Sequence, residues 1–173
     1  MNMKRVFAIF LFSLFAAVAV QAQKFALIDM EYILKNIPAY ERANEQMAQQ
    51  SKRWQGEIDE LAAEAESLYK KYQSESAFLS DEQRTAREEE ILAKEKEAAE
   101  LKRLYFGPNG ELYKKRESLM APIQDEIYNA VKEVCEQKKF SMVIDRASAG
   151  SVIYASPKVD ISNEVLAKLG YSN

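Results

Sequence analysis

The sequence contains no histidine, and its single cysteine is Cys135. These two deficits exclude His-based acid–base catalysis, Cys-His nucleophiles, intrachain disulfides and the usual His/Cys zinc sites. Carboxylates are plentiful, but no pattern suggests a concave site that would shift their pKa values. We therefore predict a protein that is not an enzyme and that needs no cofactor or metal. Cys135 is expected to be a buried small hydrophobe.

The first 22 residues are typical of a secretory signal peptide. Lys4 and Arg5 precede an apolar run over residues 6–20, and small residues lead to a cleavage site after Ala22. A retained membrane anchor is the alternative, but the run is shorter than the roughly 20 residues that span a bilayer. Cleavage would remove Lys4 and Arg5 from the 24 basic residues. The mature chain would then have 22 basic and 27 acidic residues, a net charge of −5. An exported chain of this charge has no electrostatic basis for binding nucleic acid.

Residues 41–121 are almost entirely helix-forming, and their apolar residues are too thinly spread for a globular core. Apolar positions on the first part alternate in steps of four and three, which predicts a coiled-coil seam with one weak position at Ser51. The seam positions are Met47, Ser51, Trp54, Ile58, Leu61, Ala65, Leu68 and Tyr72. We expect a long antiparallel helical hairpin.

Capping signals place the two arms of this hairpin. The first arm is expected to start near residue 39, just after Pro38, and to end near residue 78. Ser80 to Gln83 fits a capping box, so the tip lies near Leu79 and the second arm starts at Asp81. The second arm is expected to continue to about Lys139.

The position of the tip also predicts which residues face each other. Residues should pair where their numbers sum to about 160, so Trp54 is expected to face Tyr105 and Phe106. Pro38 and Pro122 then lie level with one another and mark the base of the hairpin.

The second arm contains an interruption at Gly107, Pro108 and Gly110. Proline removes a backbone donor and Gly110 can adopt a left-handed conformation, so the helix must break, kink or bulge there. A phosphate-binding loop is disfavoured because the Walker spacing and a preceding strand are missing. Gly107, Pro108 and Gly110 are our candidate hinge residues, and a fixed kink is the alternative.

The two ends of the chain carry the β-type patterns. Turn-type residues at 146–150 predict that the β-type segments on either side of them, 140–145 and 151–155, form a β-hairpin. Residues 30–37 predict a short helix, and Asp160 is expected to cap a final helix that stops at Gly170. The three segments expected to be strands are residues 24–29, 140–145 and 151–155.

The predicted fold class is α+β. A small β body of about three strands per chain, completed by oligomerisation, carries the long antiparallel α-helical hairpin as a tentacle. Oligomerisation is expected because so few short elements leave open sheet edges and bury little apolar area. The expected divisions are a signal peptide (1–22), a β body for oligomerisation (23–38 and 122–173) and the hairpin (39–121).

Four segments carry a resemblance to a known family: KFALID at 24–29, FSMVID at 140–145, SVIY at 151–154 and DISNEVL at 160–166. Together with the charged hairpin between them, they resemble the Skp/OmpH family of periplasmic chaperones over essentially the whole mature chain. The resemblance implies a homotrimer in the periplasm that holds unfolded outer-membrane β-barrel proteins without ATP. The well-known members are basic whereas this mature chain is acidic, so strong binding to anionic membranes or lipopolysaccharide is not expected. The interruption at 107–110 is a second difference, because the resemblance implies an uninterrupted tentacle.

A holdase would contact its clients through residues that the seam leaves over. The candidate client-binding residues are Tyr69, Phe78, Leu79, Phe106 and Tyr113. Ordinary packing within the hairpin is the alternative for each of them. The alternative for the whole chain is a structural coiled-coil adaptor or spacer of the cell envelope that binds a folded partner.

Overall fold

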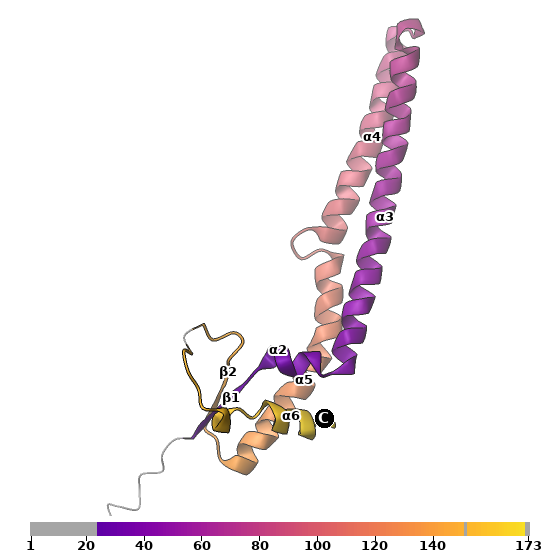
Figure 1. Ribbon diagram of the computed structural model, residues 1–173. Coiled ribbons are helices and arrows are strands. Elements are labelled where there is room, and N and C mark those ends of the chain that lie inside the picture. The colour runs from indigo at the N-terminus through magenta and orange to yellow at the C-terminus, as the bar shows by residue number, and fades with distance from the viewer. Residues whose placement is uncertain (1–23, 151, 172–173) are drawn as a thin grey trace, which may run out of the picture. The chain divides into compact units, whose positions relative to one another are not determined.

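The computed structural model describes residues 24–150 and 152–171, so the predicted signal peptide lies outside the described residues. The chain divides into two compact units. The first, which we call the sheet unit, contains residues 24–36 and 128–171, and the second, the hairpin unit, contains residues 37–127. Figure 1 labels the elements of both units.

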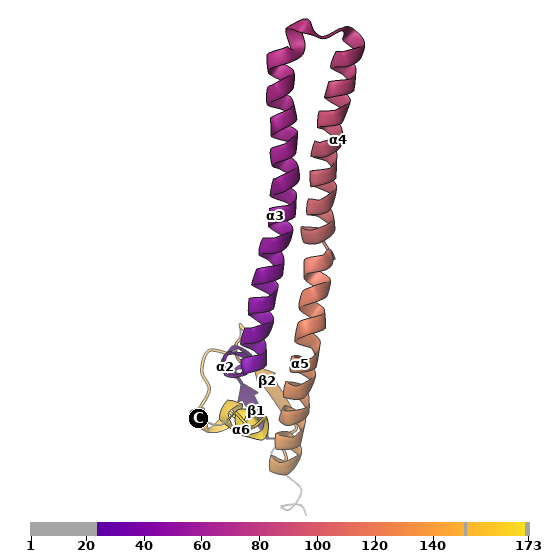
Figure 2. The ribbon, with the colours of Figure 1, turned by 90° about the vertical axis from the view of Figure 1, so that its right-hand side faces the viewer.

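The hairpin unit consists of long helices. Helix α3 (Pro38–Glu75) is followed by the 3-10 turn η1 (Ser76–Phe78), helix α4 (Asp81–Phe106) and the first part of helix α5 (Glu111–Lys138). Figure 2 shows α3 and α4 running side by side up to the tip. The predicted antiparallel hairpin is confirmed. Pro122 lies inside α5 and does not end the helix.

The predicted seam is confirmed by the burial pattern of α3. From Ser51 to Tyr72, the buried or half-buried residues are the seam positions, and the residues between them are exposed. Ile58 and Ala65 are buried on α3, and Ile91 and Ala98 are buried on α4. The hairpin is therefore held by one narrow apolar layer between helices whose other faces are charged.

Contacts between the arms confirm the predicted pairing. The rings of Trp54 and Tyr105 stack with centroids 4.7 Å apart and an interplanar angle of 12°. Nearer the tip, Lys94 pairs with Glu64 at 2.9 Å. The Tyr72 hydroxyl donates to the carboxylate of Glu88. Each pair has residue numbers that sum to within two of 160.

The tip has the predicted capping box. The Ser80 hydroxyl accepts from the Gln83 backbone N–H at 3.3 Å, and the Gln83 side chain accepts from the Ser80 backbone N–H at 3.0 Å. These two bonds satisfy backbone donors that the first turn of α4 would otherwise leave open. The arms therefore reverse direction over residues 76–80.

The interruption at residues 107–110 separates α4 from α5 and bulges away from α3 (Figure 1). The predicted break of the helix is confirmed, and its left-handed residue is Asn109, with φ of 58°, rather than Gly110. Glycine is needed at position 110 for another reason. A Cβ there would lie 2.7 Å from the Leu104 carbonyl oxygen and 2.9 Å from that of Gly107. At Gly107 a Cβ would lie 2.3 Å from the Arg103 carbonyl oxygen.

The sheet unit contains strands β1 (Phe25–Ile28) and β2 (Met142–Asp145), which pair in parallel with Phe25 opposite Met142. The predicted third strand at 151–155 is wrong, because described residues 152–155 have no strand structure. The free edge of β1 is instead extended by a single bridge between Leu27 and Asp160. The predicted β-hairpin fails because the chain turns away after β2 instead of returning along its edge.

Three short helical elements complete the sheet unit. They are α2 (Met30–Lys35), the 3-10 turn η2 (Pro157–Val159) and α6 (Ser162–Lys168). The N-cap of α6 is Ile161 rather than the predicted Asp160, whose carboxylate accepts from the Ser162 backbone at 3.0 Å. Gly170 ends the helix with φ of 84°. The buried apolar residues of this unit are Ala26, Leu27, Ile28, Ile33, Ala130, Val134, Ile161, Val165 and Leu166.

Candidate functional site

The tip of the hairpin exposes part of the predicted site. Phe78, in η1, has 88% of its surface exposed, and Tyr69 on α3 is 49% exposed. Leu79 is half-buried in the extended segment before α4. An apolar ring held in water by a short turn has no packing role inside the hairpin unit, so Phe78 is available for contact with another chain.

Two further predicted residues flank the interruption of the second arm. Phe106 ends α4, is half-buried, and meets the Tyr105 ring edge-on with centroids 6.5 Å apart. Tyr113 on α5 is 47% exposed, and its hydroxyl donates to Glu117 at 2.6 Å. This hydrogen bond to a carboxylate raises the pKa of Tyr113, so the phenol stays protonated and neutral. The structure thus places the five residues in two separate groups, at the tip and at the interruption.

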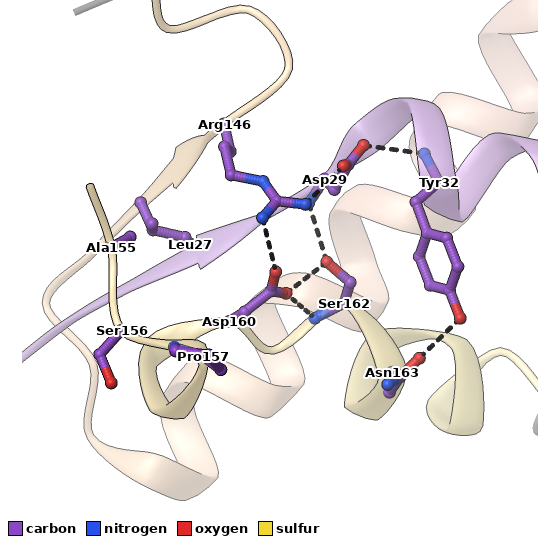
Figure 3. Close-up of a pocket in the computed structure, with 10 residues that line it drawn as sticks. All are labelled: Leu27, Asp29, Tyr32, Arg146, Ala155, Ser156, Pro157, Asp160, Ser162 and Asn163. Atoms are coloured by element: carbon purple, nitrogen blue, oxygen red, sulfur yellow. Dashed lines mark hydrogen bonds and ion pairs between the residues drawn. The ribbon is translucent and has the colours of Figure 1, made fainter. Parts of the chain in front are cut away.

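The sheet unit contains a polar pocket of about 340 Å³, which Figure 3 shows. Arg146 spans its charged side, with one nitrogen 2.7 Å from an oxygen of Asp29 and another 3.8 Å from one of Asp160. Ser162 accepts from the Asp29 backbone N–H at 2.8 Å and donates to Asp160 at 2.6 Å. These contacts join the end of β1, the residue after β2 and the start of α6.

The carboxylates around this pocket are stabilised in their charged form. A hydrogen bond from the Tyr32 backbone N–H, together with Arg146, lowers the pKa of Asp29. Partial burial acts to raise the pKa of Asp145, but hydrogen bonds from Met30 and neighbouring groups outweigh it and lower the pKa. Asp29 and Asp160 both pair with Arg146, and Asp145 accepts from the Met30 backbone N–H, so the cluster holds the sheet unit together.

An apolar hollow of about 520 Å³ lies on the same unit. Phe25 and Ile144 from the strands and Ile153 and Tyr154 from the following loop line it. Ile153 is fully exposed and Tyr154 is 84% exposed. Such a group of exposed apolar side chains at a two-stranded sheet is suited to being covered by protein.

Metal and membrane-spanning features are absent from the part of the chain that the structure describes. Residues 24–150 and 152–171 contain no cluster of three or more His, Cys, Asp and Glu side chains that could hold a metal ion. Within the same residues, no helix has the length and hydrophobicity to cross a bilayer. Cys135 is half-buried, and desolvation raises the pKa of its thiol.

Comparison with known proteins decides the family. A family model described as outer membrane protein (OmpH-like) matches residues 24–169. The chain belongs to this OmpH-like family. The predicted resemblance to the Skp/OmpH family is confirmed, and it covers both units.

Relatives of this OmpH-like chain include proteins named chaperone protein Skp. That of Yersinia enterocolitica is 26% identical over 159 residues, covering 91% of this chain and 92% of the relative. That of Photorhabdus luminescens is 25% identical over 164 residues, covering 90% of each. A crystal structure from Caulobacter crescentus, described as a candidate outer membrane chaperone (OmpH-like), matches with a TM-score of 0.70 at 14% identity over 85% of this chain and 83% of that one. It shares the fold.

Two exposed apolar residues of the OmpH-like hairpin are missing from the predicted site. Leu92 and Leu104 on α4 are 63% and 51% exposed. Both lie next to a residue that faces α3, Leu92 beside buried Ile91 and Leu104 beside stacked Tyr105. The pattern that could have found them is a second apolar residue directly adjacent to a seam position, since the two point to different sides of a helix.

Proposed function

We propose that this chain is a periplasmic holdase chaperone that binds unfolded outer-membrane β-barrel proteins and prevents their aggregation without ATP. Membership of the OmpH-like family and the similarity to proteins named chaperone protein Skp support this proposal. The observation that carries it is the hairpin unit, in which one seam holds the helices together while Tyr69, Phe78 and Tyr113 remain exposed.

Such a chaperone acts by binding equilibrium, with no chemical step. Many weak contacts along the hairpin lower the free concentration of an unfolded client, which slows its aggregation. The exposed apolar side chains are few and are spread over the tip and the interruption, so each contact is weak and the client can leave without an energy source. This mechanism requires no enzyme activity and no cofactor.

The functional form that we propose is a homotrimer joined through the sheet unit. The exposed apolar residues Phe25, Met142, Ile153 and Tyr154 support this assembly. A two-stranded sheet with an open edge is marginal alone, and neighbouring copies would cover that edge and these side chains. Light scattering on the mature chain tests the assembly, and a stable monomer at micromolar concentration would contradict it.

We further propose that Gly107, Pro108 and Gly110 form a hinge within the second arm. The break between α4 and α5 at these residues supports bending there. Hydrogen exchange with and without a client tests this role. Faster exchange at residues 104–114 than in the middle of α4, changed by the client, is the expected result, and equal protection of both segments would argue for a fixed kink.

The chaperone function is tested by diluting a urea-denatured outer-membrane protein into buffer that contains the mature chain. We expect near-stoichiometric amounts to keep the client soluble. A variant carrying Tyr69→Ser, Phe78→Ser and Tyr113→Ser should bind the client about tenfold more weakly, since truncated aromatic contacts often contribute most of an interface. Tyr128→Ser, which removes an aromatic that is 68% exposed outside the hairpin unit, is the matched control.

The competing function is that of a structural adaptor or spacer of the envelope. An adaptor would retain one folded partner in a pull-down and leave the aggregation of several unfolded clients unchanged. Failure to protect any of these clients would reject the holdase function. The periplasmic location rests on the predicted signal peptide and is tested by fractionating cells that express the full chain.

A further inference from the structure

Charge is unevenly distributed along the hairpin unit. Residues 57–100, which contain the tip, carry 14 acidic and 6 basic side chains. Residues 46–56 and 101–118, which adjoin them on the two arms, carry 7 basic and 2 acidic side chains. The chain is acidic as a whole, so this basic region around the interruption is a local exception.

A hollow of about 640 Å³ lies in the basic region, between α3 and α5. Its charged lining residues are Lys52, Arg53 and Lys115, and no carboxylate lines it. Gly56 also lines the hollow, and apart from its neighbours and its own helix backbone nothing lies within 4 Å of the position that its Cβ would occupy. We call this hollow the basic groove.

Within residues 24–150 and 152–171, the cations of the basic groove have no carboxylate partner. Nearer the tip, Lys70 pairs with Glu66 at 2.6 Å and Arg87 with Glu90 at 2.9 Å. Among the residues that the structure describes, Lys52, Arg53 and Lys115 are within 4.0 Å of no carboxylate oxygen. The groove therefore presents unpaired positive charge to whatever enters it.

The other side chains of the basic groove are amides. Gln46, Gln49 and Gln50 line it along α3. An amide both donates and accepts hydrogen bonds, which suits a peptide backbone with alternating donors and acceptors. A phosphate group accepts only, so it would use the amide donors of the three glutamines and leave their carbonyl acceptors unused. Residues 46–56 span about 15 Å of helix, the length of roughly four or five extended residues.

A second hollow of about 350 Å³ continues the groove toward the interruption. It shares Gln50 and Lys115 with the basic groove, and its lining also includes Trp54 and the ion pair of Lys114 with Glu111 at 2.9 Å. Trp54 is the single tryptophan of the chain and stacks on Tyr105. The indole adds an apolar contact surface beside Lys115, and it also reports on occupancy through its fluorescence.

We propose that the basic groove binds acidic segments of an unfolded client chain. This inference rests on the holdase function and assigns it a second binding region with a defined chemistry. An Asp- or Glu-rich segment is attracted to Lys52, Arg53 and Lys115, while the acidic residues 57–100 repel it. Charge therefore directs acidic stretches of a client to the interruption and leaves the exposed aromatics at the tip to its apolar stretches.

The direct test uses short, dye-labelled, tryptophan-free peptides that differ only in charge. One is rich in Asp and Glu, one has Asn and Gln in their place, and one has Lys. We expect the acidic peptide alone to bind by anisotropy, to change Trp54 emission, and to dissociate as salt is added. Equal binding of the neutral peptide would overturn the inference.

Charge-matched variants locate the binding. Lys52→Gln, Arg53→Gln and Lys115→Gln together should weaken the acidic peptide about tenfold, since each removes an exposed charge contact. Lys70→Gln, Lys71→Gln and Lys96→Gln remove the same charge from the acidic part of the hairpin unit and should leave affinity nearly unchanged. An equal loss in both variants would show a general charge effect and overturn the groove as the site.

Two further measurements separate this inference from its rivals. Vesicles rich in phosphatidylglycerol should not bind in a manner that depends on the three groove cations. If they do while the acidic peptide does not, the groove is a lipid site and the inference fails. If the wild type protects clients and the groove variant protects an acidic client equally well, the groove inference fails while the holdase function stands. A wild type that protects no client refutes the function itself.

Discussion

The two units of the chain are stabilised in different ways. In the hairpin unit, side chains that repeat every three or four residues join neighbouring helices, and each turn adds similar contacts to the last. In the sheet unit, the decisive contacts join distant parts of the sequence, as in the hydrogen bond from Asp29 to Ser162, 133 residues apart. The hairpin unit therefore follows from a repeated local pattern, whereas the sheet unit depends on a few specific long-range contacts.

The largest expected effect tests this contrast with the same substitution in each unit. Ile33 in the sheet unit is fully buried, whereas Ile91 on the seam is 8% exposed. Ile33→Ala should lower the free energy of unfolding by about 3–4 kcal/mol, and Ile91→Ala by about 1–2 kcal/mol, because a single layer can close around the lost volume. Urea unfolding followed by circular dichroism measures both. Equal losses would show that the seam is packed as tightly as the sheet unit.

The next effect contrasts two glycines within the hairpin unit. Gly110→Ala should lower the free energy of unfolding by about 1–3 kcal/mol, because its Cβ would meet the carbonyl oxygens of Leu104 and Gly107. Gly56→Ala, inside α3 with open space around it, should raise the free energy by about 0.5–1 kcal/mol. Thermal unfolding resolves the opposite signs. A neutral Gly110→Ala would mean that the loop after α4 rearranges freely.

A smaller gain is expected at the end of α5. Lys139 has φ of 58°, a left-handed conformation that a side chain disfavours. Lys139→Gly should raise the free energy of unfolding by about 0.5–1 kcal/mol. Lys132→Gly, inside α5, is the control and should lower it by about 1 kcal/mol. Loss of stability in both variants would indicate that the Lys139 side chain has a packing role.

The smallest effect is expected on acidification, and Asp29 provides its test in the sheet unit. The pKa of Asp29 is lowered from its usual 3.8 by the Tyr32 backbone N–H and by Arg146, so the unfolded chain takes up a proton before the folded one does. This contribution to stability is complete above the usual value and is lost as the pH falls through the lower native pKa. Asp29→Asn should flatten the decline below pH 3.8, measured by urea unfolding across pH. Asp59→Asn on exposed α3 should keep the wild-type slope.

The same contrast explains how much could be predicted from the sequence. The seam, the capping box at Ser80 and the stacking of Trp54 on Tyr105 all follow from spacing along the chain, and the structure confirms them. The parallel pairing of β1 with β2 could not be predicted, because the sequence does not show which distant segment a strand will pair with. Residues 152–155 have the composition of a strand, but composition supplies no partner edge.

The candidate site was predicted in part for a related reason. Tyr69, Phe78 and Tyr113 were recognisable because they lie off the seam, at the tip or near the interruption, and the structure shows that they are exposed. Leu92 and Leu104 were hidden by their neighbours on the seam, and the basic groove required knowing that α3 and α5 lie beside one another. Charge in a groove is a property of two helices together, so neither arm reveals it alone.

The hairpin also bears on the order in which the chain folds. Its contacts begin at the reversal near Ser80 and extend outward in small steps, which favours rapid formation. Phe25 must meet Met142 before the sheet exists, and closing so long a loop in an unfolded chain is entropically unfavourable. A hairpin that has already formed removes most of that loop, which lowers the entropic free-energy cost of closing it by about 1 kcal/mol. We therefore expect the helices to pair quickly and the sheet to close more slowly. A longer hairpin would separate the two strands further in sequence without lengthening the loop that must still close.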